Sequence, residues 1–290
     1  MTASTFPTAD ALLSRGHRAL ITGASGGIGE AFARLLAARG MDLVLVARSE
    51  DKLRALATEL SKTHGIRAEV LATDLSRPGA PRELHAACEA RGLPVDLLIN
   101  NAGFGSLGHF ETNAFEREHE QVMLNVTALV DLTHLFLAPM LARGMGGVLN
   151  VSSIAGYQPV PYMAVYGATK AFVLSFTEAL WAETRERGVR VLALCPGPVE
   201  TAFFDVVGTR DAAVGPMATP GEVAALGLRS LEQGRASVVP GWRNRFQVAL
   251  PRFLPRALIV KVAAGMMKPR GPKAPTLAPS AAGRLPGQVS

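Results

Sequence analysis

The chain has 290 residues, of which 48% are hydrophobic and 19% are charged, so it can bury a large core and is not disordered as a whole. Its two cysteines, Cys88 and Cys195, exclude a disulfide-rich secreted scaffold and any all-cysteine zinc site. The sequence shows neither a secretory signal nor an uninterrupted apolar run of about 18 residues, so we expect a cytoplasmic protein.

The positive charge is concentrated at one end of the chain. The net charge is +6, yet residues 241–290 hold nine basic residues and no acidic one, which leaves residues 1–240 with a net charge of −3. Because the basic excess belongs to the C-terminal segment, we expect no basic nucleic-acid-binding face on the folded body.

Short apolar segments alternate with longer helix-like segments along most of the chain. Strands are expected at 18–22, 42–47, 67–72, 96–100, 147–151, 190–195 and 236–239, and helices at 28–39, 49–64, 80–90, 115–143 and 165–187. Another helix is expected after Thr219, because Pro220 and Glu222 complete a capping box. The alternation predicts one α/β domain with a doubly wound, parallel, seven-stranded sheet.

Composition divides the chain into four parts. Residues 1–16 form a lead-in with a helix near 10–14, and residues 17–240 form a nucleotide-binding domain. Residues 241–269 form a basic amphipathic extension with a helix over 255–268, and residues 270–290 form a disordered tail rich in Pro, Gly, Ser and Ala.

A glycine-rich turn follows the first expected strand and opens a helix. Glycines let the backbone approach a pyrophosphate, and the helix N-terminus supplies N–H groups and partial positive charge. The candidate cofactor residues of this turn are Gly23, Ser25, Gly27, Ile28 and Gly29. The spacing Thr-Gly-x-x-x-Gly-x-Gly resembles that of the short-chain dehydrogenase/reductase superfamily.

The end of the second strand indicates which dinucleotide binds. Arg48 and Ser49 stand where an NAD site usually has an acidic residue, and a guanidinium matches a 2′-phosphate in charge and geometry. NADP(H) is therefore favoured over NAD(H). Glu50 and Asp51 keep NAD(H) open, and the alternative is that Arg48 is solvated while Ser49 only caps a helix.

Later segments match the superfamily in order. The resemblance implies cofactor contacts from Asp74 to adenine, from Asn101 and Gly103 in an Asn-Asn-Ala-Gly segment, and from a Pro-Gly turn. The candidates in that turn are Pro196, Gly197, Val199 and Thr201. Taken alone, Asp74 is equally explained as a turn cap, and Cys195 reads as a packed core thiol.

Tyr166 and Lys170 are four residues apart, which places them on one helical face. A nearby ammonium favours the phenolate, so we expect a lowered tyrosine pKa and a general acid or base. The resemblance implies catalytic roles for these two residues, for Ser153 as a donor to the substrate oxygen, and for Asn125 in a proton relay. Without the resemblance, a surface pair and a buried structural asparagine would explain these residues.

The implied function is NADP(H)-dependent interconversion of a carbonyl and a secondary alcohol on a small apolar molecule, with no metal. Residues 200–218, which are rich in apolar side chains, would form a mobile lid over the substrate. The alternatives are a non-catalytic NADP-binding sensor or scaffold, and an epimerase or dehydratase on the same fold.

Two surfaces predict partners beyond the substrate. The helix at 165–187 is apolar on more than one face, which favours a homodimer or homotetramer over a monomer whose extension covers it. Residues 242–270 mix bulky apolar and basic residues, which suits a peripheral contact with an anionic membrane. The favoured alternative is that this segment packs over the substrate cleft.

Overall fold

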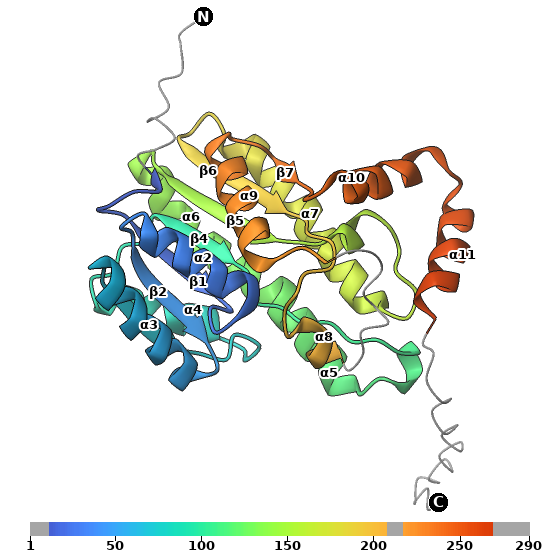
Figure 1. Ribbon diagram of the computed structural model, residues 1–290, viewed down its shortest axis with the longest axis horizontal. Coiled ribbons are helices and arrows are strands. Elements are labelled where there is room, and N and C mark those ends of the chain that lie inside the picture. Colours follow the sequence, from blue (N-terminus) through green and yellow to red (C-terminus); the bar gives the residue numbers. More distant parts are fainter. Residues whose placement is uncertain (1–11, 208–216, 269–290) are drawn as a thin grey trace, which may run out of the picture.

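The computed structural model describes residues 12–207 and 217–268 (Figure 1). The first two residues of the predicted lead-in helix, the middle of the predicted lid and the tail at 270–290 lie outside the described residues.

A single parallel sheet organises the molecule, in the order β3-β2-β1-β4-β5-β6-β7. Its strands are β1 (Arg18–Thr22), β2 (Asp42–Ala47), β3 (Ala68–Ala72), β4 (Leu97–Asn100), β5 (Gly146–Val151), β6 (Val189–Leu194) and β7 (Ser237–Val238). The predicted fold is confirmed, and no predicted strand end differs from these by more than one residue. The strand order reverses between β1 and β4, and such a reversal opens a crevice at the carboxyl ends of the strands.

Helices cover both faces of the sheet, as its apolar strands require. One face packs against α2 (Gly27–Ala38), α3 (Glu50–His64) and α9 (Pro220–Glu232). The other face packs against α4 (Ala80–Ala90), α6 (Leu129–Arg143) and α7 (Ala164–Thr184). Alternate residues of one strand serve the two cores: Leu43 and Leu45 of β2 enter the first, and Val44 and Val46 enter the second.

The helix predicted over 115–143 differs from a plain α-helix. It consists of α5 (Phe115–Val122), a π-helical segment (Met123–Ala128) and α6. The prediction was wrong in this detail because an apolar pattern does not distinguish α from π geometry. Such π segments occur often at functional sites, and Asn125 lies within this one.

The same helix meets a length and composition test for membrane spans, and it is the one helix among the described residues that does so. Leu132, Phe136 and Met140 of this helix nevertheless pack against the sheet, so we interpret it as a core helix.

The surface on which the predicted homodimer depends is partly exposed. Phe172 on α7 and Val122 on α5 are each about two-fifths exposed. Homodimer formation through these helices stays a prediction.

Buried polar side chains join the middle strands to the helices behind them. The Asn100 amide donates to Asn150 Oδ1 at 2.9 Å and to Thr133 Oγ1 at 3.0 Å, and the Asn150 amide donates to Thr177 Oγ1 at 3.0 Å. All four side chains are buried. The network fixes the carboxyl ends of β4 and β5, where the crevice opens.

We expect Asn150→Ala to lower the free energy of unfolding by about 2 kcal/mol, because buried partners lose their hydrogen bonds. Thermal unfolding should show a fall in Tm of about 2–4 °C at this chain length. The exposed control Gln233→Ala should change stability by less than about 0.5 kcal/mol. Equal effects of the two substitutions would show that the buried network is not stabilising.

Candidate active site

A cavity of about 470 Å³ lies at the carboxyl ends of β1, β4, β5 and β6. Loops that follow these four strands line it, and helices α7, α8 (Phe203–Val207) and α11 (Arg256–Met267) close it. Segments that are far apart in the sequence therefore meet around one space, as a doubly wound sheet predicts.

The glycine turn forms one wall of the cavity through Gly23, Ser25, Gly26, Gly27 and Ile28. Gly23 has a φ of +67°, and a Cβ atom there would lie 2.8 Å from Asn101 Nδ2. A Cβ on Gly29 would overlap the Gly23 carbonyl oxygen, so Gly29 permits close packing rather than lining the cavity. The turn leaves its backbone and the start of α2 open to the cavity, which fits a pyrophosphate.

Asn101 fastens the glycine turn to the end of β4. Its amide donates to the Thr22 carbonyl at 2.9 Å and to the Gly23 carbonyl at 3.3 Å. In return, Thr22 Oγ1 accepts from the backbone N–H groups of Asn101 at 2.9 Å and Ala102 at 3.0 Å. The structure therefore gives Asn101 a scaffolding role, and both Asn101 and Gly103 line the cavity. Their predicted contacts with the cofactor stay predictions.

Arg48 and Ser49 are exposed at the junction of β2 and α3. Ser49 occupies the N-cap position of α3, but its side chain makes no capping hydrogen bond. Neither residue lines the cavity, whereas Lys52 does, one turn into α3. Lys52 was missed at the sequence level, although its spacing of three from Ser49 places it on the same helical face.

Asp74 acts as a turn cap in this structure. Its Oδ1 accepts from the Ser76 backbone N–H at 3.0 Å and from the Ser76 hydroxyl at 2.7 Å. Burial alone would raise the pKa of Asp74, but these hydrogen bonds and the nearby charges of Arg48 and Arg77 hold it below its usual value. Its predicted contact with adenine stays a prediction.

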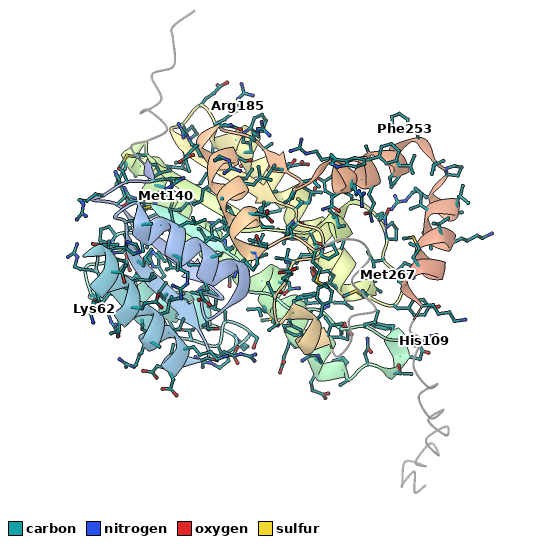
Figure 2. The ribbon with its side chains drawn as sticks, viewed as in Figure 1. Lys62, His109, Met140, Arg185, Phe253 and Met267 are labelled. Atoms are coloured by element: carbon teal, nitrogen blue, oxygen red, sulfur yellow. The ribbon has the colours of Figure 1, made fainter. Side chains whose placement is uncertain are left out.

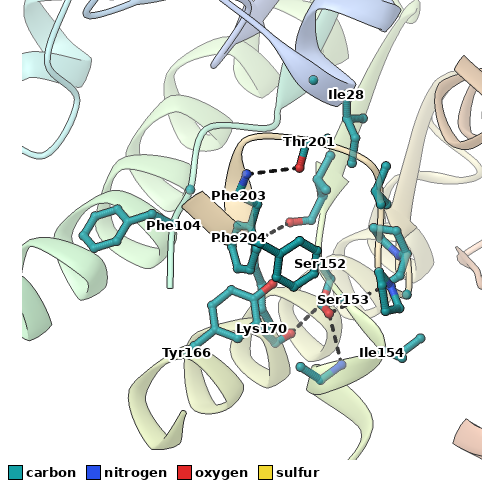
Figure 3. Close-up of a pocket in the computed structure, with 18 of the residues that line it drawn as sticks. Ile28, Phe104, Ser152, Ser153, Ile154, Tyr166, Lys170, Thr201, Phe203 and Phe204 are labelled. Atoms are coloured by element: carbon teal, nitrogen blue, oxygen red, sulfur yellow. Dashed lines mark hydrogen bonds between the residues drawn. The ribbon is translucent and has the colours of Figure 1, made fainter. Parts of the chain in front are cut away.

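Ser153, Tyr166 and Lys170 meet in the cavity (Figure 3). The Ser153 and Tyr166 hydroxyls are hydrogen-bonded to each other. The Lys170 ammonium donates to the Val151 carbonyl at 2.8 Å and lies 5.8 Å from the centre of the Tyr166 ring. The preceding residue, Ser152, donates its hydroxyl to the Lys170 carbonyl instead, at 2.7 Å.

Burial is the main cause of the pKa shifts of Tyr166 and Lys170. It raises the pKa of Tyr166 to about 12, although the hydrogen bond with Ser153 acts in the opposite direction. Burial also lowers the pKa of Lys170 to about 8. The expected decrease in the tyrosine pKa was therefore wrong for this structure, because burial disfavours the charged phenolate. Tyr166 is a neutral phenol near pH 7 and can donate a proton.

Asn125 supports the loop that follows β4. Its Oδ1 accepts from the Phe104 N–H at 3.1 Å, and its amide donates to the Phe104 carbonyl at 2.9 Å and to Thr169 Oγ1 at 3.1 Å. The structure thus places Asn125 beside the site as a fully bonded, buried group. Its predicted part in a proton relay stays a prediction.

The segment after β6 completes the cavity through Pro196, Gly197, Val199 and Thr201. A Cβ on Gly197 would lie 2.6 Å from Asn244 Nδ2, so the glycine permits a close approach of the C-terminal segment. Cys195 is buried, and burial raises the pKa of its thiol to about 12. The prediction of a packed core thiol is confirmed.

Apolar side chains pack near the ring of Tyr166, and the Phe203 ring lies 5.4 Å from it between centroids. Met163, Tyr166 and Phe203 each have an atom 3.1–3.2 Å from the position that a Cβ on Gly105 would take. Phe203 and Phe204 line the cavity, so the predicted lid covers it in its described part. Further apolar lining comes from Phe104, Ile154, Val160, Ala263, Met266 and Met267.

Comparisons with known proteins agree with this geometry. A family model described as short chain dehydrogenase matches residues 17–211. A 7beta-hydroxysteroid dehydrogenase of Collinsella aerofaciens is 36% identical over 64% of this chain and 70% of its own length. Rattus norvegicus 17-beta-hydroxysteroid dehydrogenase type 3 is 35% identical over 68% of this chain and 65% of its own length.

A solved short-chain dehydrogenase from Sphingobium yanoikuyae in complex with NADPH superposes with a TM-score of 0.74 at 31% identity. The superposition covers 83% of this chain and 97% of that one.

We expect Gly23→Ala to weaken NADPH binding at least about tenfold, because a left-handed φ is strained in alanine and the new methyl group collides with Asn101. Fluorescence titration with NADPH measures this change. Gly221→Ala is the matched control, since a Cβ there meets nothing within 4 Å. Unchanged affinity in Gly23→Ala would show that the turn does not shape the dinucleotide site.

Proposed function

Because the chain belongs to the short-chain dehydrogenase family, we propose that it is an NADP(H)-dependent oxidoreductase that interconverts a ketone and a secondary alcohol on a bulky apolar molecule. The observation that carries this proposal is the convergence of Ser153, Tyr166 and Lys170 in a cavity that the glycine turn also lines. A sensor or scaffold that only binds a dinucleotide has no need of these three side chains.

The residues present fit an NADP(H) dinucleotide. The glycine turn would hold the pyrophosphate, Arg48 and Lys52 would face the 2′-phosphate, and Lys170 would hold the nicotinamide ribose. The NADPH complex of the Sphingobium yanoikuyae relative supports this assignment. When bound, the cofactor supplies or accepts the hydride.

Tyr166 and Ser153 would act together on the substrate oxygen. In the reductive direction, Ser153 donates a hydrogen bond to the carbonyl oxygen and Tyr166 Oη gives that oxygen its proton. The neutral state of the Tyr166 phenol suits this direction. Lys170 then faces the phenolate that is formed, and a nearby ammonium stabilises that charge.

The walls of the cavity favour an uncharged substrate. Lys52 and Lys170 are the charged residues among those that line it in the described chain, and both belong to the proposed cofactor side. Val160, Met163 and Phe203 give the substrate side an apolar surface, and Gln158 and Gln247 supply polar contacts. Relatives named as hydroxysteroid dehydrogenases support a rigid, fused-ring ketone or alcohol as the substrate class.

We expect Tyr166→Phe to reduce kcat by about a thousandfold, because general acid catalysis contributes about 10²–10⁴. Its NADPH affinity should be unchanged. The assay follows NADPH oxidation against a panel of steroid and aromatic ketones. Tyr162→Phe is the matched control: its ring packs on His109 and does not line the cavity.

Two outcomes would contradict the proposal. Full activity in Tyr166→Phe would exclude the assigned proton donor. Binding of NADPH without any net oxidation across the panel would favour a sensor, or an epimerase or dehydratase that uses the cofactor transiently.

We expect Arg48→Ala to raise the KM for NADPH about 10- to 100-fold and to leave the KM for NADH nearly unchanged, since only NADPH carries the 2′-phosphate. Arg54→Ala, on α3 just after Arg48, is the control, because its guanidinium pairs with Glu50 on the exposed face. An equal rise in KM with both cofactors would mean that Arg48 does not bind the 2′-phosphate.

A further inference from the structure

The described chain ends in two helices that stand apart from the sheet. These are α10 (Trp242–Ala249) and α11, joined by a 3₁₀ turn (Leu250–Phe253), and we call residues 242–268 the C-terminal arm. Figure 1 shows the arm at the edge of the molecule opposite α3.

The inner side of the arm is firmly attached to the body. The Asn244 amide donates to the Pro240 carbonyl at 2.8 Å and fills the space beside Gly197. Val248 packs on the small core around Leu174 and Cys195. On α11, Ala263 is buried and lines the cavity together with Met267. These contacts fix the orientation of the arm. They therefore also fix which side of it faces outward.

The outer side of the arm is an uncovered apolar surface. Eight of the twelve large hydrophobic side chains exposed in the described chain lie on it. Trp242, Phe246 and Leu250 follow one another at intervals of four along α10 and into the turn, and Leu258, Val262 and Met266 do so along α11. Residues four apart share a helical face, so each helix presents one apolar stripe.

The turn between the two stripes is the most exposed part of this surface. Phe253 is 83% exposed, and Leu254 follows it directly. Figure 2 shows Phe253 pointing away from the molecule, whereas Met267 lies on the side of α11 nearer the body. An uncovered patch of this kind usually marks a site of association.

The charge of the arm restricts what can cover this surface. Residues 242–268 contain six basic residues and no acidic one. Lys261 and Lys268 are seven apart, so they share a face beside the stripe of α11, and Arg243 lies over the Trp242 ring at 5.4 Å. A twofold contact of this surface with itself would bring like charges together, which is costly.

We propose that the outer side of the C-terminal arm docks on an anionic lipid bilayer, with the apolar stripes entering the interface and the basic side chains contacting the headgroups. Helices that lie in this interface combine aromatic and aliphatic residues on one side with lysine and arginine beside them. The arm shows this combination on two helices joined by a protruding phenylalanine.

Docking would place the substrate entrance at the membrane. Met266 is half exposed and also lines the cavity, so the outer surface of the arm and the wall of the cavity meet at this residue. A lipid-dissolved ketone could then reach Tyr166 without crossing bulk water. This consequence rests on the proposed function, whereas the docking itself does not.

The test is flotation of the full chain with vesicles of phosphatidylcholine that contain about one third phosphatidylserine, without cofactor or substrate. We expect binding at low salt, loss of binding as salt is raised, and weak binding to pure phosphatidylcholine. The triple substitution W242S/F246S/F253S should weaken binding at least about tenfold while activity on a water-soluble ketone is kept, because these side chains do not line the cavity.

A matched pair of single variants shows which exposed aromatic side chain binds the vesicles. Phe253→Ser should weaken vesicle binding, and Phe115→Ser, which removes a ring that is 77% exposed on α5, should not. The proposal is overturned if the full chain stays unbound on anionic vesicles at low salt, or if the triple variant binds as well as the parent. It is also overturned if light scattering shows that the triple substitution only dissociates a dimer and vesicles are never bound.

Discussion

The buried ammonium of Lys170 is the constraint on which the architecture of the site depends. Removing a positive charge from water is costly unless strong hydrogen-bond acceptors surround it. The Val151 carbonyl at the end of β5 supplies one acceptor, at 2.8 Å. Gly103 leaves room for the ammonium, since a Cβ there would lie 3.5 Å from Lys170 Nζ and 2.9 Å from Asn125 Oδ1. The site therefore requires that the first turns of α7 lie beside the carboxyl end of β5, where Lys170 meets Val151. Burial lowers the pKa of Lys170 and raises the pKa of Tyr166. Near pH 7 the lysine therefore carries the positive charge of the site, and the tyrosine keeps its proton.

Much of the fold and of the candidate site could be predicted from the sequence, because each of these predictions depended on a local pattern. Strands buried on both faces show continuous apolar runs, and the capping box at Thr219 marks the start of α9, where the structure forms it. The glycine turn, the Asn-Asn-Ala-Gly segment and the Tyr-x-x-x-Lys pair were placed by spacing. Asn101 shows the limit of such placement. The pattern marks it as a cofactor contact, but only the structure reveals that its amide is used to join β4 to the glycine turn.

What could not be predicted depends on packing between segments distant in the sequence. The π segment is invisible to periodicity, because its six residues are too few to distinguish π from α spacing. The tyrosine pKa was predicted in the wrong direction because spacing gives the distance to a charge but not the loss of water around the phenol. Lys52 was missed for a related reason. A lysine in the first turn of a charged helix looks like a solvated residue until the fold brings that turn to the cavity.

The C-terminal arm shows why two interpretations of one segment need not exclude each other. Closing the cavity and contacting a membrane seemed to be alternatives, because Arg256 lies on a different side of the helix from Lys261 and Lys268. That objection assumes that one helix provides the whole surface. In the structure, α11 lines the cavity through Ala263, Met266 and Met267, and α10 is attached separately through Asn244. The remaining circumference of both helices is free to form a second, outward surface. A short helix can thus form a wall of the cavity on one side and an interface on the other, because 3.6 residues per turn divide its sequence between two faces.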